Sequence, residues 1–143
     1  MSRKIAREVA MKLVFAQMLG GEDTYEAVLD QSDIPEAPSE EDFDYANGVM
    51  QGIENQKANI DNLIEQYAIG WTIDRMARVD LCVLRIAIYE MLYRADVPDS
   101  VAINEAVELA KRFGGEHSSA YINGILGTIS RKKIGADLNG EPC

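Results

Sequence analysis

The chain has 143 residues, of which 47% are hydrophobic and 27% are charged, and its formal net charge is −10 at pH 7. This length is enough for one domain to bury a core without disulfides or metal, and the composition is that of a globular protein rather than a membrane-spanning one. The strong negative charge argues against a general nucleic-acid binder unless the charge is unevenly distributed.

The charge is uneven along the chain. Residues 22–65 contain 13 acidic residues and one basic residue, so this segment carries −12 and the remainder of the chain carries +2. Four basic residues lie within residues 1–12, and residues 131–133 are Arg-Lys-Lys. Two basic ends therefore flank an acidic middle.

The cysteines and the N-terminal composition indicate where the protein works. Cys82 lies in an apolar helical pattern and Cys143 is the last residue, so neither is expected in a structural disulfide, and no zinc-binding spacing is present. No apolar signal core follows the N-terminus, and apolar runs are short. We expect a cytoplasmic protein without a membrane span, metal or cofactor.

No segment alternates apolar and polar residues with a period of two, so the sequence predicts an all-α fold of about seven helices. A first helix is predicted over about residues 3–19 and is ended by Gly20-Gly21. A short second helix is predicted over about residues 24–31. Ser39 followed by Asp42 predicts the start of the next helix.

The third and longest predicted helix spans about residues 40–69. Its apolar positions from Phe43 to Tyr67 alternate in steps of three and four, with Lys57 as the one charged member of the seam. Such a seam must be covered, either within a helical bundle, which we favour, or by a second chain. Gly48 and Gly52 inside this helix predict close packing against a neighbour.

Residues 70–72, Gly-Trp-Thr, interrupt the helical pattern and divide the predicted domain, residues 1–134, into halves of about 1–69 and 70–134. A short helix is predicted at residues 74–76. Longer helices follow at about 79–95, which is the most apolar, then at 102–113 and at 118–131. Residues 135–143 have no periodicity and are predicted to be a disordered tail.

Enzymatic motifs are missing from this sequence. There is no glycine-rich phosphate loop, no serine or cysteine in a recognisable nucleophile motif, and His117 is the only histidine. His117 is better explained as a loop or capping residue than as a proton carrier. The sequence therefore predicts a binding protein rather than an enzyme.

The first helix is the best candidate for an RNA contact. Arg3 and Arg7 are one helical turn apart, Lys4 stands beside them, and Phe15 continues the same face. Cations bind phosphates and aromatic rings stack on unpaired bases, so this face suits single-stranded RNA. The alternative is that the cations only solvate the helix end while Phe15 packs in the core.

Two later residues also have two possible roles. Arg85 lies among apolar neighbours, where its guanidinium needs either a carboxylate or an external anion. Tyr121 lies near the predicted start of the last helix, where free N–H groups favour anions, although simple packing would also explain a tyrosine there.

Three segments resemble the NusB family of transcription antitermination factors. They are LRIAIYEM at residues 84–91, VPDSVAINEAVELAKRFG at 97–114 and SSAYINGIL at 118–126. The early AREVAMKLVF segment with its preceding bases, and Gly70 and Trp71 with Arg75, fit the same family in order and spacing. The resemblance covers about residues 3–131.

This resemblance implies two small helical bundles packed into one domain, without catalytic activity. Family members bind a single-stranded RNA element, boxA, together with a ribosomal protein that acts as NusE, and the pair joins an RNA polymerase antitermination complex that also serves rRNA synthesis. By position, the implied RNA contacts are Arg3, Lys4, Arg7, Phe15, Arg85 and Tyr121. Asp80 matches an acidic position near the protein-protein face.

The chain also departs from the family pattern. Leu81 and Ile5 stand where relatives often carry a basic residue, which weakens the cationic surface and implies weak RNA binding without the partner. The alternative function is a helical adaptor or homodimer that binds RNA weakly or incidentally.

Overall fold

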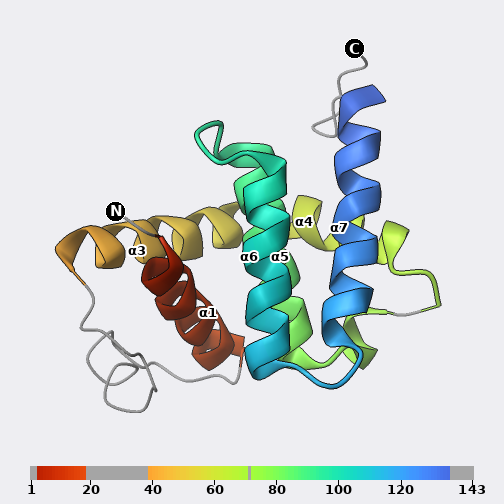
Figure 1. Ribbon diagram of the computed structural model, residues 1–143, viewed down its shortest axis with the longest axis horizontal. Helices are drawn as coiled ribbons and strands as arrows, with labels where there is room; N and C mark the ends of the chain where they lie inside the picture. The colour runs from red at the N-terminus through yellow and green to blue at the C-terminus, as the bar shows by residue number, and fades with distance from the viewer. Residues whose placement is uncertain (1–2, 19–38, 71, 136–143) are drawn as a thin grey trace.

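The structure is a computed structural model that describes residues 3–18, 39–70 and 72–135. All regular elements in these ranges are helical, as predicted (Figure 1). They are α1 (Lys4–Met18), α3 (Glu40–Asn55), α4 (Lys57–Tyr67), a short 3₁₀ helix (Ile73–Arg75), α5 (Arg78–Tyr93), α6 (Asp99–Phe113) and α7 (Ser118–Gly135). The predicted stop at Gly20-Gly21, the helix at residues 24–31, Trp71 and, apart from Gly135, the predicted tail lie outside the described residues.

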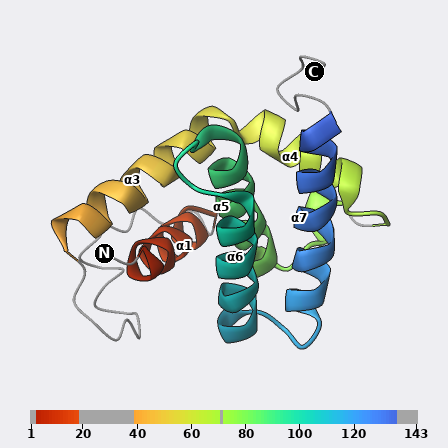
Figure 2. The same ribbon diagram turned by 45° about the horizontal axis from the view of Figure 1, so that its top comes forward.

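Helix α5 is the centre of the fold. It contacts each of the other α-helices in the described ranges, and its residues from Leu81 to Ile88 are all buried. Helices α1 and α3 pack against each other and against α5, while α6 and α7 pack against each other and against α5 (Figures 1 and 2). A helix that is apolar on all sides must be enclosed in this way. Within the described ranges, no helix is both long and apolar enough to cross a membrane.

The single long helix predicted over residues 40–69 is wrong, because the structure divides it into α3 and α4. The break is at Gln56, whose φ and ψ of −113° and 16° leave the helical region. Helix α3 contacts α1 and α5, whereas α4 contacts α5 and α7. The break allows Ile60 and Ile64 to be buried while Lys57 stays exposed, which a straight continuation of the seam would not allow.

The starts of two helices have clear local causes. The Ser39 hydroxyl accepts from the Asp42 N–H at 3.2 Å, and the Asp42 carboxylate accepts from the Ser39 N–H at 2.9 Å, so the predicted capping box is confirmed. Helix α6 begins at Asp99, three residues before its predicted start. Pro98 precedes it in an extended conformation that suits the residue before a helix.

Helix α3 packs closely on α5 at one of its two glycines. A Cβ atom on Gly52 would lie 2.2 Å from the Tyr89 ring, whereas a Cβ on Gly48 would meet nothing within 4 Å. The predicted close approach is therefore confirmed at Gly52 and wrong at Gly48.

The two glycines should respond in opposite directions to alanine. Gly52→Ala should lower the free energy of unfolding by about 1 kcal/mol, because overpacking costs about 1 to 3 kcal/mol and the better helix propensity returns about 1. Gly48→Ala should raise it by about 0.5 to 1 kcal/mol, since only the propensity changes. Urea unfolding of both variants measures the difference, and equal changes of the same sign would contradict the packing described at Gly52.

Candidate nucleic-acid interface

The start of α1 carries the predicted cations Arg3 and Lys4. Arg3 Nη2 donates to Asp96 Oδ2 at 2.8 Å, and the Arg3 guanidinium carbon lies 4.5 Å from the centre of the Tyr45 ring. The Arg3 side chain is 36% exposed, and Lys4 is also exposed. Both side chains are therefore placed to meet an external anion at the surface.

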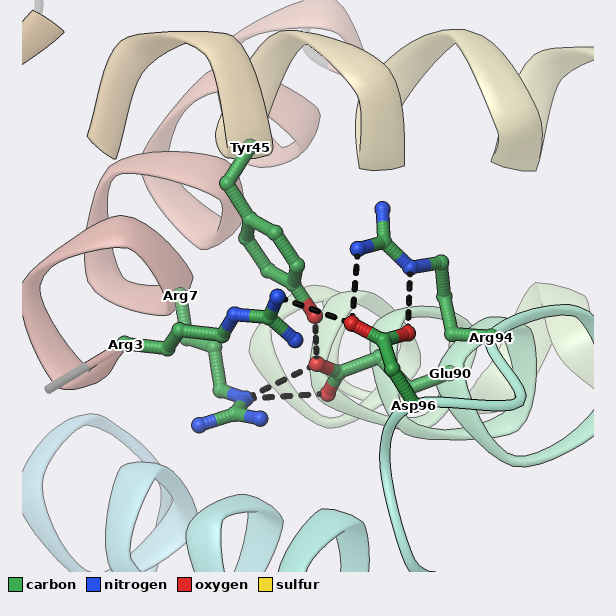
Figure 3. A network of polar contacts seen from close by, with 6 residues as sticks. All are labelled: Arg3, Arg7, Tyr45, Glu90, Arg94 and Asp96. Carbon is green, nitrogen blue, oxygen red and sulfur yellow. Dashed lines mark hydrogen bonds and ion pairs between the residues drawn. The ribbon is translucent and has the colours of Figure 1, made fainter. Parts of the chain in front are cut away.

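Arg7 is placed differently, in the interior between α1, α3 and α5 (Figure 3). Its Nε donates to both oxygens of the Glu90 carboxylate, at 2.9 and 3.0 Å, and the Tyr45 hydroxyl donates to the same carboxylate. Arg7 is 4% exposed and Glu90 is 1% exposed. Arg7 thus links α1 to α5. Its guanidinium is buried and so is not placed to make the phosphate contact predicted for it.

The Tyr45 hydroxyl is held as a hydrogen-bond donor in this network. Its burial, and then its hydrogen bond to the charged Glu90, raise the pKa of the Tyr45 hydroxyl well above its usual value. The phenol therefore stays protonated across the whole physiological pH range. One buried carboxylate thus receives hydrogen bonds from two different helices.

Arg85 also lies in an interior ion pair, which is the structural alternative left open by its sequence. Its Nε and Nη2 donate to the two oxygens of the Asp61 carboxylate, both at 2.9 Å. The Arg85 side chain is 7% exposed and the Asp61 side chain 20%. This bidentate pair joins α5 to α4 and engages Nε and Nη2 of Arg85, so the RNA contact predicted for Arg85 stays a prediction.

The predicted aromatic contacts, Phe15 and Tyr121, are both half-buried. Phe15 packs partly against the core, which is close to the core position that the alternative interpretation expected. Its side chain is not fully buried. Tyr121, in the first turn of α7, lines a cavity of about 470 Å³ with residues of the α6–α7 connection and Met76. An aromatic ring beside apolar walls suits the flat face of an unpaired base.

Asp80 contributes a carboxylate to the same cavity. Its Oδ1 is buried and has no hydrogen-bond partner within the described residues. Burial, and then this neighbouring carboxylate, raise the pKa of the Tyr121 hydroxyl. The contact with a protein partner predicted for Asp80 stays a prediction.

A further cationic cluster was missed by the sequence reasoning. Lys12 Nζ of α1 lies 4.9 Å from the centre of the Phe113 ring, and the Arg112 guanidinium carbon lies 4.7 Å from it. Arg112 also donates to both oxygens of Glu8, at 3.0 and 3.1 Å, and its side chain is 46% exposed. Two cations from distant parts of the sequence therefore share one ring near the surface.

Helix α1 runs antiparallel to α5. Arg7 pairs with Glu90 near the end of α5, and Met18 Sδ lies 3.1 Å from Cys82 Sγ near its start. Asp80, which lines the Tyr121 cavity, precedes Glu90 by ten residues on the same helix, or about 15 Å. The start of α1 and the Tyr121 cavity therefore lie toward opposite ends of α5, and the predicted contacts do not meet at one point.

The cluster on Phe113 joins the middle of α1 to the end of α6. Lys12 lies on α1 between Arg7 and Met18, and Phe113 precedes by two residues Gly115, which lines the Tyr121 cavity. The ends of α1 and α6 and the start of α7 lie at the same end of the molecule (Figure 1). We call the resulting surface the α1–α6–α7 track, and it consists of Arg3, Lys4, Lys12, Arg112, Phe113 and Tyr121.

A family model, similar sequences and a solved structure all point to the same protein family. The model of the NusB family matches residues 4–131. The transcription antitermination protein NusB of Acetivibrio thermocellus is 43% identical over 137 residues, covering 94% of this chain and 92% of that protein. The protein of the same name from Clostridium botulinum strain Loch Maree is 40% identical and covers 90% of this chain and 99% of its own length. The solved structure of T. maritima NusB is 33% identical, with a TM-score of 0.78 and 92% of each chain covered.

Proposed function

The chain belongs to the NusB family of transcription antitermination factors, and on this premise we propose that it binds single-stranded boxA-type RNA together with a NusE-type ribosomal protein. Members of this family are transcription factors and not enzymes. This protein and the NusE-type ribosomal protein would together join an RNA polymerase antitermination complex in the cytoplasm. The side chains of this protein must therefore bind the RNA and position it beside the ribosomal protein.

The α1–α6–α7 track is the observation that carries this proposal. It offers exposed cations at the start of α1 and at the end of α6, together with the Phe113 ring at the end of α6 and the Tyr121 ring at the start of α7. Lysine and arginine neutralise backbone phosphates, and aromatic rings stack on unpaired bases with about 1 to 3 kcal/mol for each base. A duplex keeps its bases stacked inside, so this combination favours a single strand.

The acidic part of the chain supports the same assignment. Within the described residues, exposed carboxylates of the acidic segment lie on α3 and α4, including Glu41, Asp44, Glu54 and Glu65. These helices lie at the opposite edge of the molecule from the α6–α7 connection (Figure 2). The charge of Glu54 and Glu65 repels nucleic acid from that edge and so limits nonspecific binding, whereas Glu41 and Asp44 lie beside Arg3.

Removing cations from the track should weaken RNA binding. We expect the double variant Lys4→Gln and Lys12→Gln to bind fluorescein-labelled boxA RNA about tenfold more weakly at about 0.1 M salt. Because two phosphate contacts are lost, the slope of log affinity against log salt should fall by about 1.4. Fluorescence anisotropy, with and without the NusE-type protein, measures both quantities.

A matched control changes the same net charge elsewhere. Lys57 at the start of α4 and Lys132 near the end of α7 are exposed and lie outside the track. The double variant Lys57→Gln and Lys132→Gln should change boxA affinity less than about twofold, through screened long-range charge alone. Equal losses in the two double variants would reject the track, and wild-type binding that does not distinguish boxA from a scrambled strand would reject the proposed function.

The alternative of an adaptor or homodimer finds little support in the described surface. The large hydrophobic side chains exposed within the described ranges are Ile69, after α4, and Val101, on α6. Single exposed apolar residues are ordinary on monomers, whereas dimer interfaces need a contiguous apolar patch. Light scattering should therefore give the mass of a monomer bound to RNA.

A further inference from the structure

Asp96, in the connection between α5 and α6, receives two guanidinium groups on one carboxylate (Figure 3). Arg94 donates to it through Nε and Nη2, both at 3.1 Å, and Arg3 donates through Nη2 at 2.8 Å. One oxygen, Oδ2, accepts from both arginines. Arg94 is absent from the residues that sequence reasoning assigned to RNA.

This arrangement has the geometry of an anion site. Two guanidinium forks that converge on one small acceptor group match the tetrahedral oxygens of a phosphate as well as they match a carboxylate. We propose, building on the RNA-binding function above, that Arg3 and Arg94 form a clamp for one RNA backbone phosphate. In the free protein Asp96 occupies this clamp as an internal competitor.

The clamp is held in place by the interior of the protein. The guanidinium carbons of Arg3 and Arg94 lie 4.5 and 4.8 Å from the centre of the Tyr45 ring, so this one aromatic ring supports both cations. Tyr45 is itself fixed by its hydrogen bond to the buried Glu90. Two arginines on a fixed ring lose less conformational entropy when they bind an anion than two free surface arginines would.

A ligand can reach the clamp from solvent. The side chains of Arg3, Arg94 and Asp96 are 36%, 28% and 50% exposed. Arg3, Arg94 and Tyr45 also line a cavity of about 340 Å³, whose α3 side carries the carboxylates of Glu41, Asp42 and Asp44. The hydrogen bonds from Arg94 and then Arg3 hold the pKa of the Asp96 carboxyl far below its usual range, so the competitor stays charged and only displacement frees the arginines.

Neutralising the competitor should therefore strengthen RNA binding. We expect Asp96→Asn to bind boxA RNA roughly three- to tenfold more tightly than wild type at low salt, because an amide cannot compete for two guanidinium groups as a carboxylate does. Its salt slope should be steeper by about 0.7, which corresponds to one additional phosphate contact. Asp96 is exposed, so the variant should unfold at nearly the same temperature as wild type.

Asp44→Asn is the matched control for charge. Asp44 is exposed, lines the same cavity, and makes no ion pair among the described residues. Asp44→Asn therefore changes the net charge equally without freeing the clamp, and its RNA affinity should rise clearly less than that of Asp96→Asn. Adding Arg94→Gln to Asp96→Asn should abolish the gain. A gain that is equal in Asp96→Asn and Asp44→Asn, or that survives loss of Arg94, would overturn the clamp.

A second readout separates the clamp from the proposed function. Inorganic phosphate, titrated into ¹⁵N-labelled Asp96→Asn protein, should shift the Nε–H resonances of Arg3 and Arg94 at millimolar concentration and shift them less in wild type. If boxA RNA binds neither protein while phosphate still shifts both resonances, the proposed function fails and the clamp stands. If RNA binds but phosphate shifts neither resonance and Asp96→Asn gains nothing, the clamp fails and the function stands.

Discussion

Glu90→Ala is expected to lower the free energy of unfolding by about 3 to 5 kcal/mol, the largest loss that we predict for a single substitution. Glu90 is 1% exposed and accepts from Arg7 and from the Tyr45 hydroxyl, so its removal leaves a guanidinium buried without a counter-charge. The hydrogen bonds that join Arg7 of α1 and Tyr45 of α3 to the central helix would be lost together. Urea unfolding followed by circular dichroism measures the change.

Two further variants show whether the unpaired charge causes this loss. Glu108→Ala removes a carboxylate whose ion pair with Lys111 is long, at 3.7 Å, and exposed, so it should cost less than about 0.5 kcal/mol. Combining Arg7→Met with Glu90→Leu removes both buried charges and should recover most of the stability that Glu90→Ala loses. A Glu90→Ala protein as stable as Glu108→Ala would contradict the interior ion pair.

Asp61→Ala should have the second-largest effect and lower the free energy of unfolding by about 2 to 3 kcal/mol. It removes both acceptors of the buried Arg85 guanidinium and so loosens α4 from α5. The loss should be smaller than at Glu90, because Asp61 is 20% exposed and water can partly replace it. Thermal unfolding of Asp61→Ala, Glu90→Ala and wild type under the same conditions tests whether the loss at Asp61 is the smaller one.

The same ion pair separates a structural role for Arg85 from an RNA contact. The combination of Arg85→Met with Asp61→Leu removes both charges and should leave boxA affinity within about twofold of the wild-type value. A folded double variant with a tenfold loss of affinity would return Arg85 to the RNA-binding residues.

The helical fold could be predicted because helical periodicity is a local property of the sequence. The starts of α1 and α3, the buried character of α5 and the helix after Gly115 all follow from apolar spacing and capping residues. The break at Gln56 could not be predicted in this way. The seam from Phe43 to Tyr67 continues in sequence across it, and only the different neighbours of α3 and α4 favour separation.

The roles of individual arginines depend on partners far along the chain. Arg3 and Arg7 are both arginines at the beginning of the same segment, yet Arg7 faces Glu90 in the interior while Arg3 stays at the surface. The cluster on Phe113 was equally hidden, because about a hundred residues separate Lys12 from Arg112. Cations near an aromatic residue at a helix end, as in Lys111-Arg112-Phe113, were the signal available in the sequence.

The most direct test of the proposed track is to locate the RNA on the protein. BoxA RNA that contains 4-thiouridine is irradiated in complex with the protein, and the crosslinked peptides are identified by mass spectrometry. We expect crosslinks in α1, at the end of α6 and at the start of α7, with Phe113 and Tyr121 among the modified residues. Crosslinks confined to the acidic surface of α3 and α4 would contradict the proposed track.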